Sequence, residues 1–211
     1  MNLANKLTIF RILLVPLMVI IPFFGINGEI MGISITYLIM DAIFIIASIT
    51  DKLDGYIARS RNQVTTFGKF LDPVADKILV LAAMIMLVEA GRLPAWIPII
   101  VLSREFIVSG YRLIAVEKGG KVIAASIWGK LKTVTQMISI ILIFIDKFNF
   151  FDFILATTDA KMAMESSALI YMNQGEIIFN VITSICLLIS VVATIFSGYD
   201  YLKNGKDLLK N

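Results

Sequence analysis

Four aspartates stand within one short stretch of the chain, and their spacing indicates a metal-binding site. Asp51 and Asp54 are three residues apart, and Asp72 and Asp76 are four apart. Each pair therefore shares one face of a helix if its segment is helical. The flanking segments are almost wholly apolar, and a charged side chain at the centre of a membrane helix costs roughly 2.5–3.5 kcal/mol. Binding of a divalent cation would offset that cost.

The side-chain types in this stretch restrict both the metal and the chemistry. Ligands that are all oxygen atoms suit a hard cation such as Mg²⁺ or Mn²⁺. The chain has no histidine, so histidine catalysis and histidine-ligated zinc are excluded, and a carboxylate is the natural general base. Gly55 and Gly68 lie on the same faces as the aspartates, where the missing side chains let a ligand approach the backbone.

Helices on either side of the polar stretch 59–68 must position these aspartates. A helix over 33–58 ends with the first pair, and a helix over 68–90 begins with the second. The polar stretch can turn the chain between them, so that the two pairs face each other. Pro73 falls in the first turns of the second helix, where its missing backbone N–H costs little.

The composition predicts an integral membrane protein. The 211 residues are 58 % hydrophobic and 17 % charged, with a mean hydropathy of +0.87, whereas soluble domains are nearer half apolar and about a quarter charged. At about 20 residues a span, we expect a single all-α membrane domain over residues 1–211. It should have six transmembrane helices and a short N-terminal interfacial helix. The predicted spans are 12–24, 33–58, 68–90, 95–116, 126–145 and 177–196.

The segments outside these spans carry fewer signals. In the N-terminal segment, Asn5, Thr8 and Arg11 form a polar stripe at three-residue steps, which either anchors the helix at the lipid head groups or serves a binding site. Residues 27–32 form a glycine-rich turn, 148–176 an external loop and 197–211 a polar tail. Asp41 lies ten residues before Asp51, about 15 Å along a helix, too far for direct metal ligation.

The distribution of basic residues predicts the topology. With six spans both termini lie on one side, and of the 19 Lys and Arg residues only Arg92, Lys147 and Lys161 fall opposite. The positive-inside rule then places the termini and the aspartates in the cytoplasm, in a multi-pass protein of the inner (cytoplasmic) cell membrane.

Four basic residues join the aspartates at the predicted cytoplasmic ends: Arg104, Arg112, Lys130 and Lys132. An acidic metal site beside a cationic cluster suits phosphoryl transfer between two anionic substrates. Alternatively, the basic residues only set the orientation of the chain in the membrane and contact anionic lipid. That alternative explains Arg104 less well, because it lies inside an apolar span beside Glu105. A structural pairing of these two is possible, but adjacent helix positions point in different directions.

The full pattern Asp51-x2-Asp54-Gly55-x2-Ala58-Arg59-x8-Gly68-x3-Asp72-x3-Asp76 resembles the signature of the CDP-alcohol phosphotransferases. The resemblance implies that Asp51, Asp54 and Asp72 are metal ligands, and that Asp76 is both a ligand and the catalytic base. It implies two Mg²⁺ or Mn²⁺ ions. The CDP-binding residues it implies are Asn5, Thr8, Asp54, Gly55, Ala58, Arg59 and Gly68.

Segments 5–11, 103–110, 122–126 and 129–133 resemble the bacterial glycerol-3-phosphate branch of that family. The resemblance implies CDP-diacylglycerol as donor, glycerol 3-phosphate as acceptor, and phosphatidylglycerophosphate and CMP as products. The acceptor phosphate would lie at Arg104, Arg112, Lys130 and Lys132. Membrane lipid and a second copy of the chain are the other expected partners, and nucleic acid is not one.

Two alternatives remain. The first is a sister enzyme that uses serine or inositol phosphate as acceptor. The second is a divalent-cation transporter, since intramembrane aspartates also mark ion pathways. The outer halves of the predicted spans carry few acidic or polar residues, which disfavours a path through the membrane.

Overall fold

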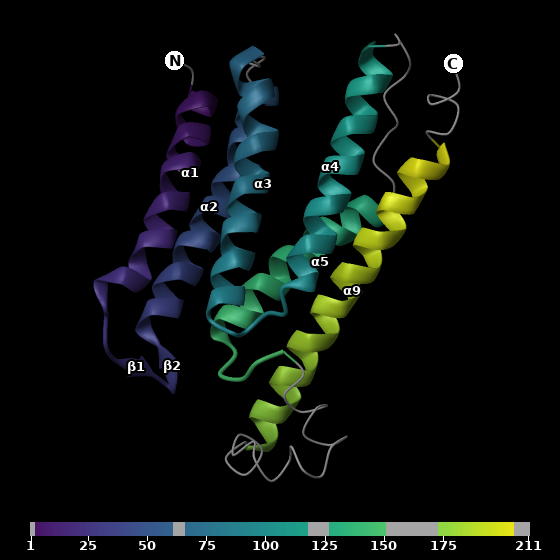
Figure 1. The fold of residues 1–211 in the computed structure, drawn as a ribbon. Helices are drawn as coiled ribbons and strands as arrows, with labels where there is room; N and C mark the ends of the chain where they lie inside the picture. The colour runs from purple at the N-terminus through teal and green to yellow at the C-terminus, as the bar shows by residue number, and fades with distance from the viewer. Residues whose placement is uncertain (1–2, 61–65, 118–126, 151–172, 205–211) are drawn as a thin grey trace. The chain divides into compact units, whose positions relative to one another are not determined.

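The computed structural model describes residues 3–60, 66–117, 127–150 and 173–204, without the side chains of 3–5, 52–60, 66–70, 72–73, 116 and 204. The elements in these ranges are mostly helices (Figure 1). They are α1 (Leu3–Ile20), η1 (Ile21–Phe24), β1 (Glu29–Ile30), β2 (Ile33–Ser34), α2 (Ile35–Ser60), α3 (Thr66–Glu89), α4 (Trp96–Glu117), α5 (Ile127–Ile145) and α9 (Gln174–Asn204).

The chain divides into two compact units, which are described separately. Unit 1 comprises residues 1–91 and 141–147, and unit 2 comprises residues 92–140 and 148–211. The prediction of a single domain over residues 1–211 is not decided by this division and stays a prediction.

Helix α1 packs against both α2 and α3 in unit 1. Buried apolar side chains recur along α3 at four-residue steps, at Ala75, Leu79, Ala83 and Leu87. This spacing puts them on one face of the helix. Small alanines alternate with larger leucines along this face, which lets neighbouring helices approach closely. The three helices therefore form the frame that positions the aspartate motif.

The N-terminal segment does not form a separate interfacial helix. Helix α1 runs without a break from Leu3 to Ile20 and continues into the short η1. The prediction of a separate helix ending near Arg11 is wrong, because Thr8 and Arg11 are buried and extend the inner face of the same helix. Outer positions such as Leu13 and Leu17 are exposed.

The predicted glycine-rich turn closes a small hairpin. Strands β1 and β2 pair antiparallel, with Ile30 opposite Ile33. The two residues between them, Met31 and Gly32, both have positive φ, at 55° and 78°. Positive φ at both central residues is typical of the type I′ turn that suits the twist of a two-residue hairpin.

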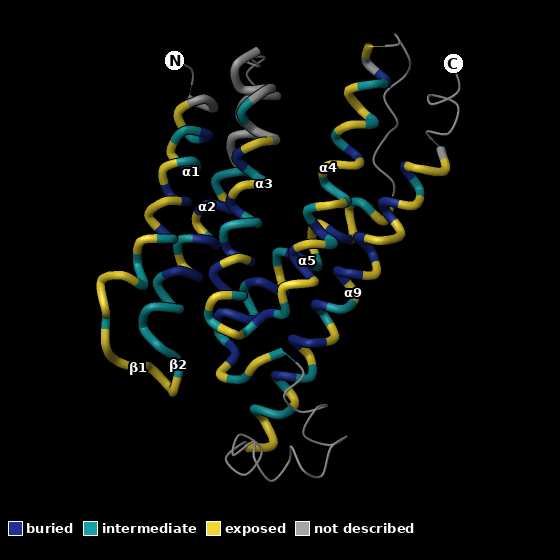
Figure 2. Tube along the Cα trace, viewed as in Figure 1, coloured by how far each residue is buried: buried dark blue, intermediate teal, exposed yellow. Residues whose placement is uncertain are grey.

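Helix α9 in unit 2 has a polar inner face and an apolar outer face. Its buried residues include several small polar ones at helical spacing, namely Asn180, Thr183, Ser184, Ser190, Thr194 and Ser197. Its exposed face carries isoleucines at matching intervals, namely Ile178, Ile182, Ile185, Ile189 and Ile195. Figure 2 shows the resulting alternation of buried and exposed bands along α9. Small polar residues inside and large apolar residues outside are the pattern of a helix packed in lipid.

The last helix is longer than the sequence predicts. Helix α9 continues to Asn204, so the predicted polar tail from residue 197 is wrong for its first eight residues. Ser197 and Tyr201 are buried at 0 % and 2 % exposure, because this part of α9 packs against α4. The polar composition of these residues predicted a tail, but their packing keeps them in the helix.

The other helix boundaries agree to within a few residues with those predicted from the sequence. The small shift at the start of α3 changes the position of Pro73 within the helix. Helix α3 begins at Thr66, so Pro73 stands at its eighth position. The prediction that this proline lies in the first turns is therefore wrong. Of the predicted external loop 148–176, residues 151–172 lie outside the described part of the chain.

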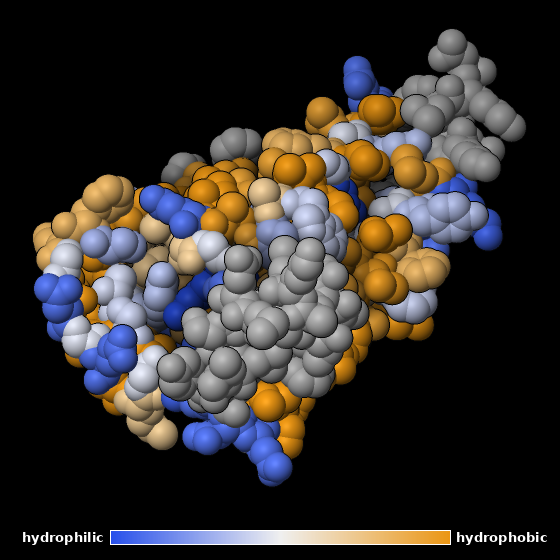
Figure 3. Space-filling view, turned by 60° about the horizontal axis from the view of Figure 1, so that its bottom comes forward, coloured by the Kyte–Doolittle hydropathy of each residue, from blue (hydrophilic) through white to orange (hydrophobic). Residues whose placement is uncertain are grey.

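Many large hydrophobic side chains of the described residues are exposed, and Figure 3 shows hydrophobic residues over much of the visible face. Among the described residues, three helical segments are long and apolar enough to cross a membrane, namely Lys6–Phe24, Ile127–Ile145 and Gln174–Lys203. Helix α4 carries Arg104, Glu105 and Arg112, which lower its hydropathy. The all-helical membrane class is thus supported, and the number of six spans stays a prediction.

The outer face of α9 provides a test of this class. Ile185 and Ile189 are exposed there, so changing both to lysine would place two charges against lipid at about 2.5–3.5 kcal/mol each. We expect the double variant to lose most of its yield in the membrane fraction, measured by immunoblotting, while the matched double change to leucine keeps it. A double-lysine variant recovered from membranes at the wild-type level would contradict the lipid-facing assignment.

Candidate active site

The aspartate motif lies where α1, α2 and α3 meet in unit 1. Asp51 and Asp54 stand in the last three turns of α2, and Asp72 and Asp76 in the first half of α3. Both pairs are on helices, as their spacing predicts. The first residues of α1, the end of α2 and the start of α3 lie at the same end of this unit, at the top of Figure 1. The chain thus brings the motif and the N-terminal polar stripe to one end of a three-helix bundle.

A buried ion pair joins the N-terminal stripe to the motif. The Nη1 atom of Arg11 lies 2.8 Å from Oδ1 of Asp51, and the arginine side chain is 0 % exposed while the aspartate side chain is 32 % exposed. An arginine this deeply buried does not anchor the helix at lipid head groups, so that interpretation of Arg11 is wrong. The ion pair instead orients the first aspartate of the motif while leaving its carboxylate accessible.

Several predicted site residues are in described helices, but their side chains lie outside the described part of the structure. These residues are Asn5, Asp54, Gly55, Ala58, Arg59, Gly68 and Asp72. Among the predicted donor-side and metal residues, the described side chains are those of Thr8, Asp51 and Asp76. Thr8 is buried and Asp76 is half-buried. The roles predicted for all of these residues stay predictions.

The donor set of the motif fits a hard divalent cation. Its four side chains are all carboxylates, which suit Mg²⁺ or Mn²⁺. Among the described side chains, which include only Asp51 and Asp76 of the four, no group of three or more potential metal ligands lies together. Three observations therefore support a divalent cation at the motif. They are the four carboxylate ligands, their spacing along two helices and the partial exposure of Asp51.

Glu105 of α4 links two of the predicted acceptor-phosphate residues in unit 2. Its Oε1 atom accepts a hydrogen bond from Nη1 of Arg104 at 2.7 Å and from Nζ of Lys132 at 2.5 Å. Both hydrogen bonds join charged groups, and such bonds are stronger than those between neutral groups. The structural pairing of Arg104 with Glu105, one of the two alternatives that the sequence left open, is therefore present. The arginine side chain is long enough to reach its neighbour's carboxylate, which is itself drawn toward Lys132 on α5.

The C-terminal part of α9 completes this basic cluster. Nη2 of Arg104 donates a hydrogen bond to the Ser197 hydroxyl, and Nη2 of Arg112 donates one to the Tyr201 hydroxyl at 2.7 Å. The two guanidinium carbons lie 5.9 Å and 5.5 Å from the centre of the Tyr201 ring, within the range of cation–π attraction. Three helices thus supply one connected set of polar side chains.

Lys130 differs from the other three predicted cations. It is exposed, whereas Lys132 is buried, because two residues along a helix correspond to a rotation of about 200°. The structure therefore brings Arg104, Arg112 and Lys132 together through Glu105 and α9, and it leaves Lys130 on a different face of α5.

Sequence reasoning missed the role of Arg11 as the partner of Asp51 in unit 1. In unit 2 it missed Ser197 and Tyr201 as members of the basic cluster. Arg11 belongs to a polar stripe that the sequence did reveal, but its partner lies 40 positions away. Ser197 continues the small polar residues Ser190 and Thr194 at helical spacing. That periodicity is the signal that could have extended α9 and found its polar end.

The Arg11–Asp51 ion pair yields a stability prediction. Replacing Arg11 with methionine removes the buried partner of Asp51, and we expect a loss of about 1–2 kcal/mol. This is less than the roughly 3–5 kcal/mol of a fully buried pair, since Asp51 is partly hydrated. Thermal unfolding in detergent would measure it. Arg11→Lys should lose less, and Lys6→Met, at an exposed position of the same helix, should be neutral. An Arg11→Met variant as stable as wild type would show that the ion pair has no structural role.

Several known proteins are similar to this chain, two of them over nearly its whole length. A chain from Bacillus subtilis named CDP-diacylglycerol–glycerol-3-phosphate 3-phosphatidyltransferase is 38 % identical over 99 % of this chain and 97 % of its own. A protein of that name from Rickettsia typhi is 37 % identical over 97 % of both chains. Another from Haemophilus influenzae is 44 % identical over 66 % of this chain and 73 % of its own.

The family model described as CDP-alcohol phosphatidyltransferase matches residues 1–196. This range includes the aspartate motif, the basic cluster of α4 and α5, and α9 up to the residue before Ser197. With the family model covering most of the chain and relatives of the same kind aligned over nearly all of it, the chain belongs to the CDP-alcohol phosphatidyltransferase family.

Proposed function

We propose that this protein transfers the phosphatidyl group of CDP-diacylglycerol to sn-glycerol 3-phosphate, giving phosphatidylglycerophosphate and CMP. The observation that carries the proposal is the near full-length similarity to relatives named for this reaction. The intact aspartate pattern from Asp51 to Asp76 supports it. So does the separate basic cluster, which suits an acceptor that itself carries a phosphate.

Asp51, Asp54, Asp72 and Asp76 would hold the metal, which we take to be two Mg²⁺ or Mn²⁺ ions. Bound divalent cations neutralise the charge of a pyrophosphate and of the leaving phosphate. The protein's contribution is to hold carboxylates at three- and four-residue spacing on two packed helices. The Arg11 contact would orient Asp51 toward this site.

In the proposed reaction Asp76 acts as the general base. Its carboxylate takes the proton from one hydroxyl of glycerol 3-phosphate, and the resulting oxygen attacks the lipid-side phosphorus. A new phosphorus–oxygen bond to glycerol forms as the bond to CMP breaks. Because the chain lacks histidine, a carboxylate is the side chain best suited to this proton transfer.

The donor nucleotide would lie along α2 near the N-terminal stripe. Gly55 and Ala58 have small or absent side chains that let cytidine approach the helix, and Arg59 would contact the pyrophosphate. Asn5, Thr8, Asp54 and Gly68 complete the proposed CDP-binding set. Thr8 is buried on the inner face of α1, the face that also carries Arg11, so these two residues belong to the interior of unit 1 rather than to the lipid surface.

The acceptor phosphate would bind at Arg104, Arg112, Lys130 and Lys132. In the connected part of this set, Arg104 and Lys132 contact the single carboxylate of Glu105, and Arg112 contacts Tyr201 beside them. Three cations and one carboxylate leave an excess of positive charge. A phosphate monoester carries about −1.5 to −2 charges at neutral pH, so it would nearly balance that excess. Serine brings no such charge, and the cluster therefore favours a phosphorylated acceptor.

We further propose that the site faces the cytoplasm from the inner cell membrane. The bias of Lys and Arg toward one side of the predicted spans supports this orientation. A homodimer is part of the same proposal and rests on the family resemblance alone.

Release of CMP by the purified protein tests the function. With CDP-diacylglycerol and Mg²⁺ in detergent, we expect release only when glycerol 3-phosphate is added, and none with serine, inositol phosphate or no acceptor. A chelator should abolish it, and added Mg²⁺ should restore it. Release of CMP with another alcohol would show that this alcohol, and not glycerol 3-phosphate, is the acceptor. A folded protein that releases no CMP with any acceptor would favour the cation-transporter alternative.

The role of Asp76 has its own test. Asp76→Asn keeps the size of the side chain but removes the base, so we expect turnover to fall by about 10²- to 10⁴-fold with an unchanged thermal unfolding midpoint. Glu89→Gln is the matched control, since Glu89 is an exposed acid on the same helix, and it should retain full activity. Wild-type turnover by Asp76→Asn would exclude Asp76 as the base.

A further inference from the structure

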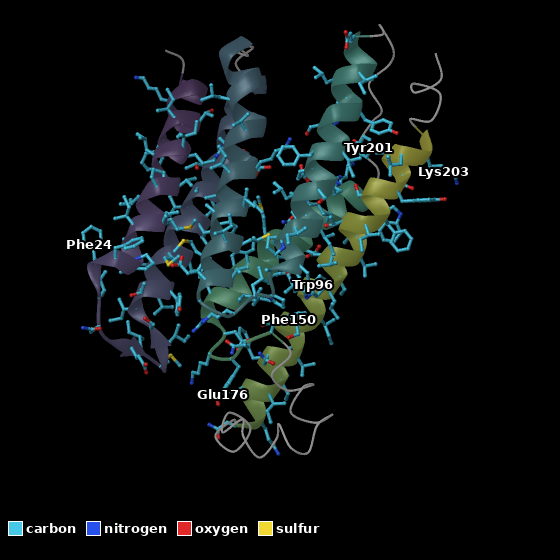
Figure 4. All side chains as sticks on the ribbon, viewed as in Figure 1. Phe24, Trp96, Phe150, Glu176, Tyr201 and Lys203 are labelled. Atoms are coloured by element: carbon cyan, nitrogen blue, oxygen red, sulfur yellow. The ribbon has the colours of Figure 1, made fainter. Side chains whose placement is uncertain are left out.

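We infer that Tyr201 is a positioning residue for the acceptor-phosphate site, an inference that rests on the proposed function. Tyr201 lies near the C-terminal end of α9, on the side that faces α4 (Figure 4). It is 2 % exposed, although it belongs to a polar stretch of sequence. Its hydroxyl accepts the hydrogen bond from Arg112, and its ring lies near two guanidinium groups.

The ring of Tyr201 gathers two positive charges that their own helix keeps apart. Arg104 and Arg112 are eight residues apart on α4, a rise of about 12 Å along the axis. Both guanidinium carbons nevertheless lie within 6 Å of the same ring centre, at 5.9 Å and 5.5 Å. The negative face of an aromatic ring attracts cations and so reduces the repulsion between them. Two like charges held on one ring form a pre-arranged site for an anion with more than one negative charge.

The neighbouring turn of α9 restricts Arg104 further. Ser197, four residues before Tyr201, accepts a hydrogen bond from this arginine. A Cβ atom added at Gly198 would lie 3.4 Å from Cγ of Arg104, and one added at Gly129 of α5 would lie 3.7 Å from its Nη2. Backbone from two helices therefore closes around the arginine side chain. Glu105 holds its Nη1 atom from the α4 side.

Arg112 depends on Tyr201 in a different way, because it is exposed. A free arginine side chain has many rotamers and loses that freedom when it binds a phosphate. The hydrogen bond of 2.7 Å to the buried Tyr201 hydroxyl restricts this freedom before the acceptor arrives. Tyr201 thus acts through Arg112 and Arg104. Its removal should weaken acceptor binding more than it slows the chemical step.

The test compares Tyr201→Phe with wild type in steady-state CMP release. The variant keeps the ring but loses the hydroxyl. We expect the KM for glycerol 3-phosphate to rise about tenfold, the effect of losing one hydrogen bond to a charged group. The kcat, the KM for CDP-diacylglycerol and the thermal unfolding midpoint should stay near wild type. Tyr201→Leu also removes the ring and should raise the acceptor KM further.

Tyr199→Phe is the matched control, because Tyr199 is exposed on the same helix and should behave as wild type. An unchanged acceptor KM in Tyr201→Phe would overturn the inference. So would equal losses in kcat and in both KM values that track a fall in the unfolding midpoint, since a purely structural role has that signature. A wild-type protein that releases no CMP with glycerol 3-phosphate would instead overturn the proposed function itself.

Discussion

A charged side chain that is withdrawn from water needs a partner of opposite charge, and this requirement determines the arrangement of polar groups in both units. Arg11 is fully buried and meets Asp51 at 2.8 Å. Arg104 and Lys132 share one oxygen of Glu105. Removing one partner of such a pair leaves a charge buried alone, which is far more costly than the pair itself. Each pair therefore determines how its helices face one another, and the rest of the packing follows.

The helices around these ion pairs have the polarity expected in lipid. On α9 the isoleucines face outward, while serine, threonine and asparagine line the inner face. In lipid there is no hydrophobic force between helices, so small polar residues that allow close approach provide the packing. This explains why Ser197 and Tyr201 can be buried at the end of a helix whose sequence is polar there. It also explains how α9 can reach the arginines of α4.

The sequence predicted the local features of the site well. The spacing of Asp51, Asp54, Asp72 and Asp76 predicted two helices, and α2 and α3 contain them. The apolar runs predicted every helix found in the described residues, with most boundaries close. The errors occurred where composition and packing disagree. The segment before residue 12 and the tail from residue 197 both looked polar. The described part of each belongs to a longer helix, because Thr8 and Arg11 in the first, and Ser197 and Tyr201 in the second, are buried.

The sequence by itself determined the residues capable of chemistry, their order along helices and the membrane class, because these depend on residue type and on periods of three to four residues. The tertiary structure alone decided the partners. Arg11 meets Asp51, Glu105 meets Lys132, and Tyr201 meets Arg104 and Arg112. No local pattern encodes such contacts, since they join positions on different helices. Their selection depends on which faces become buried together, and only there must each charge find a partner.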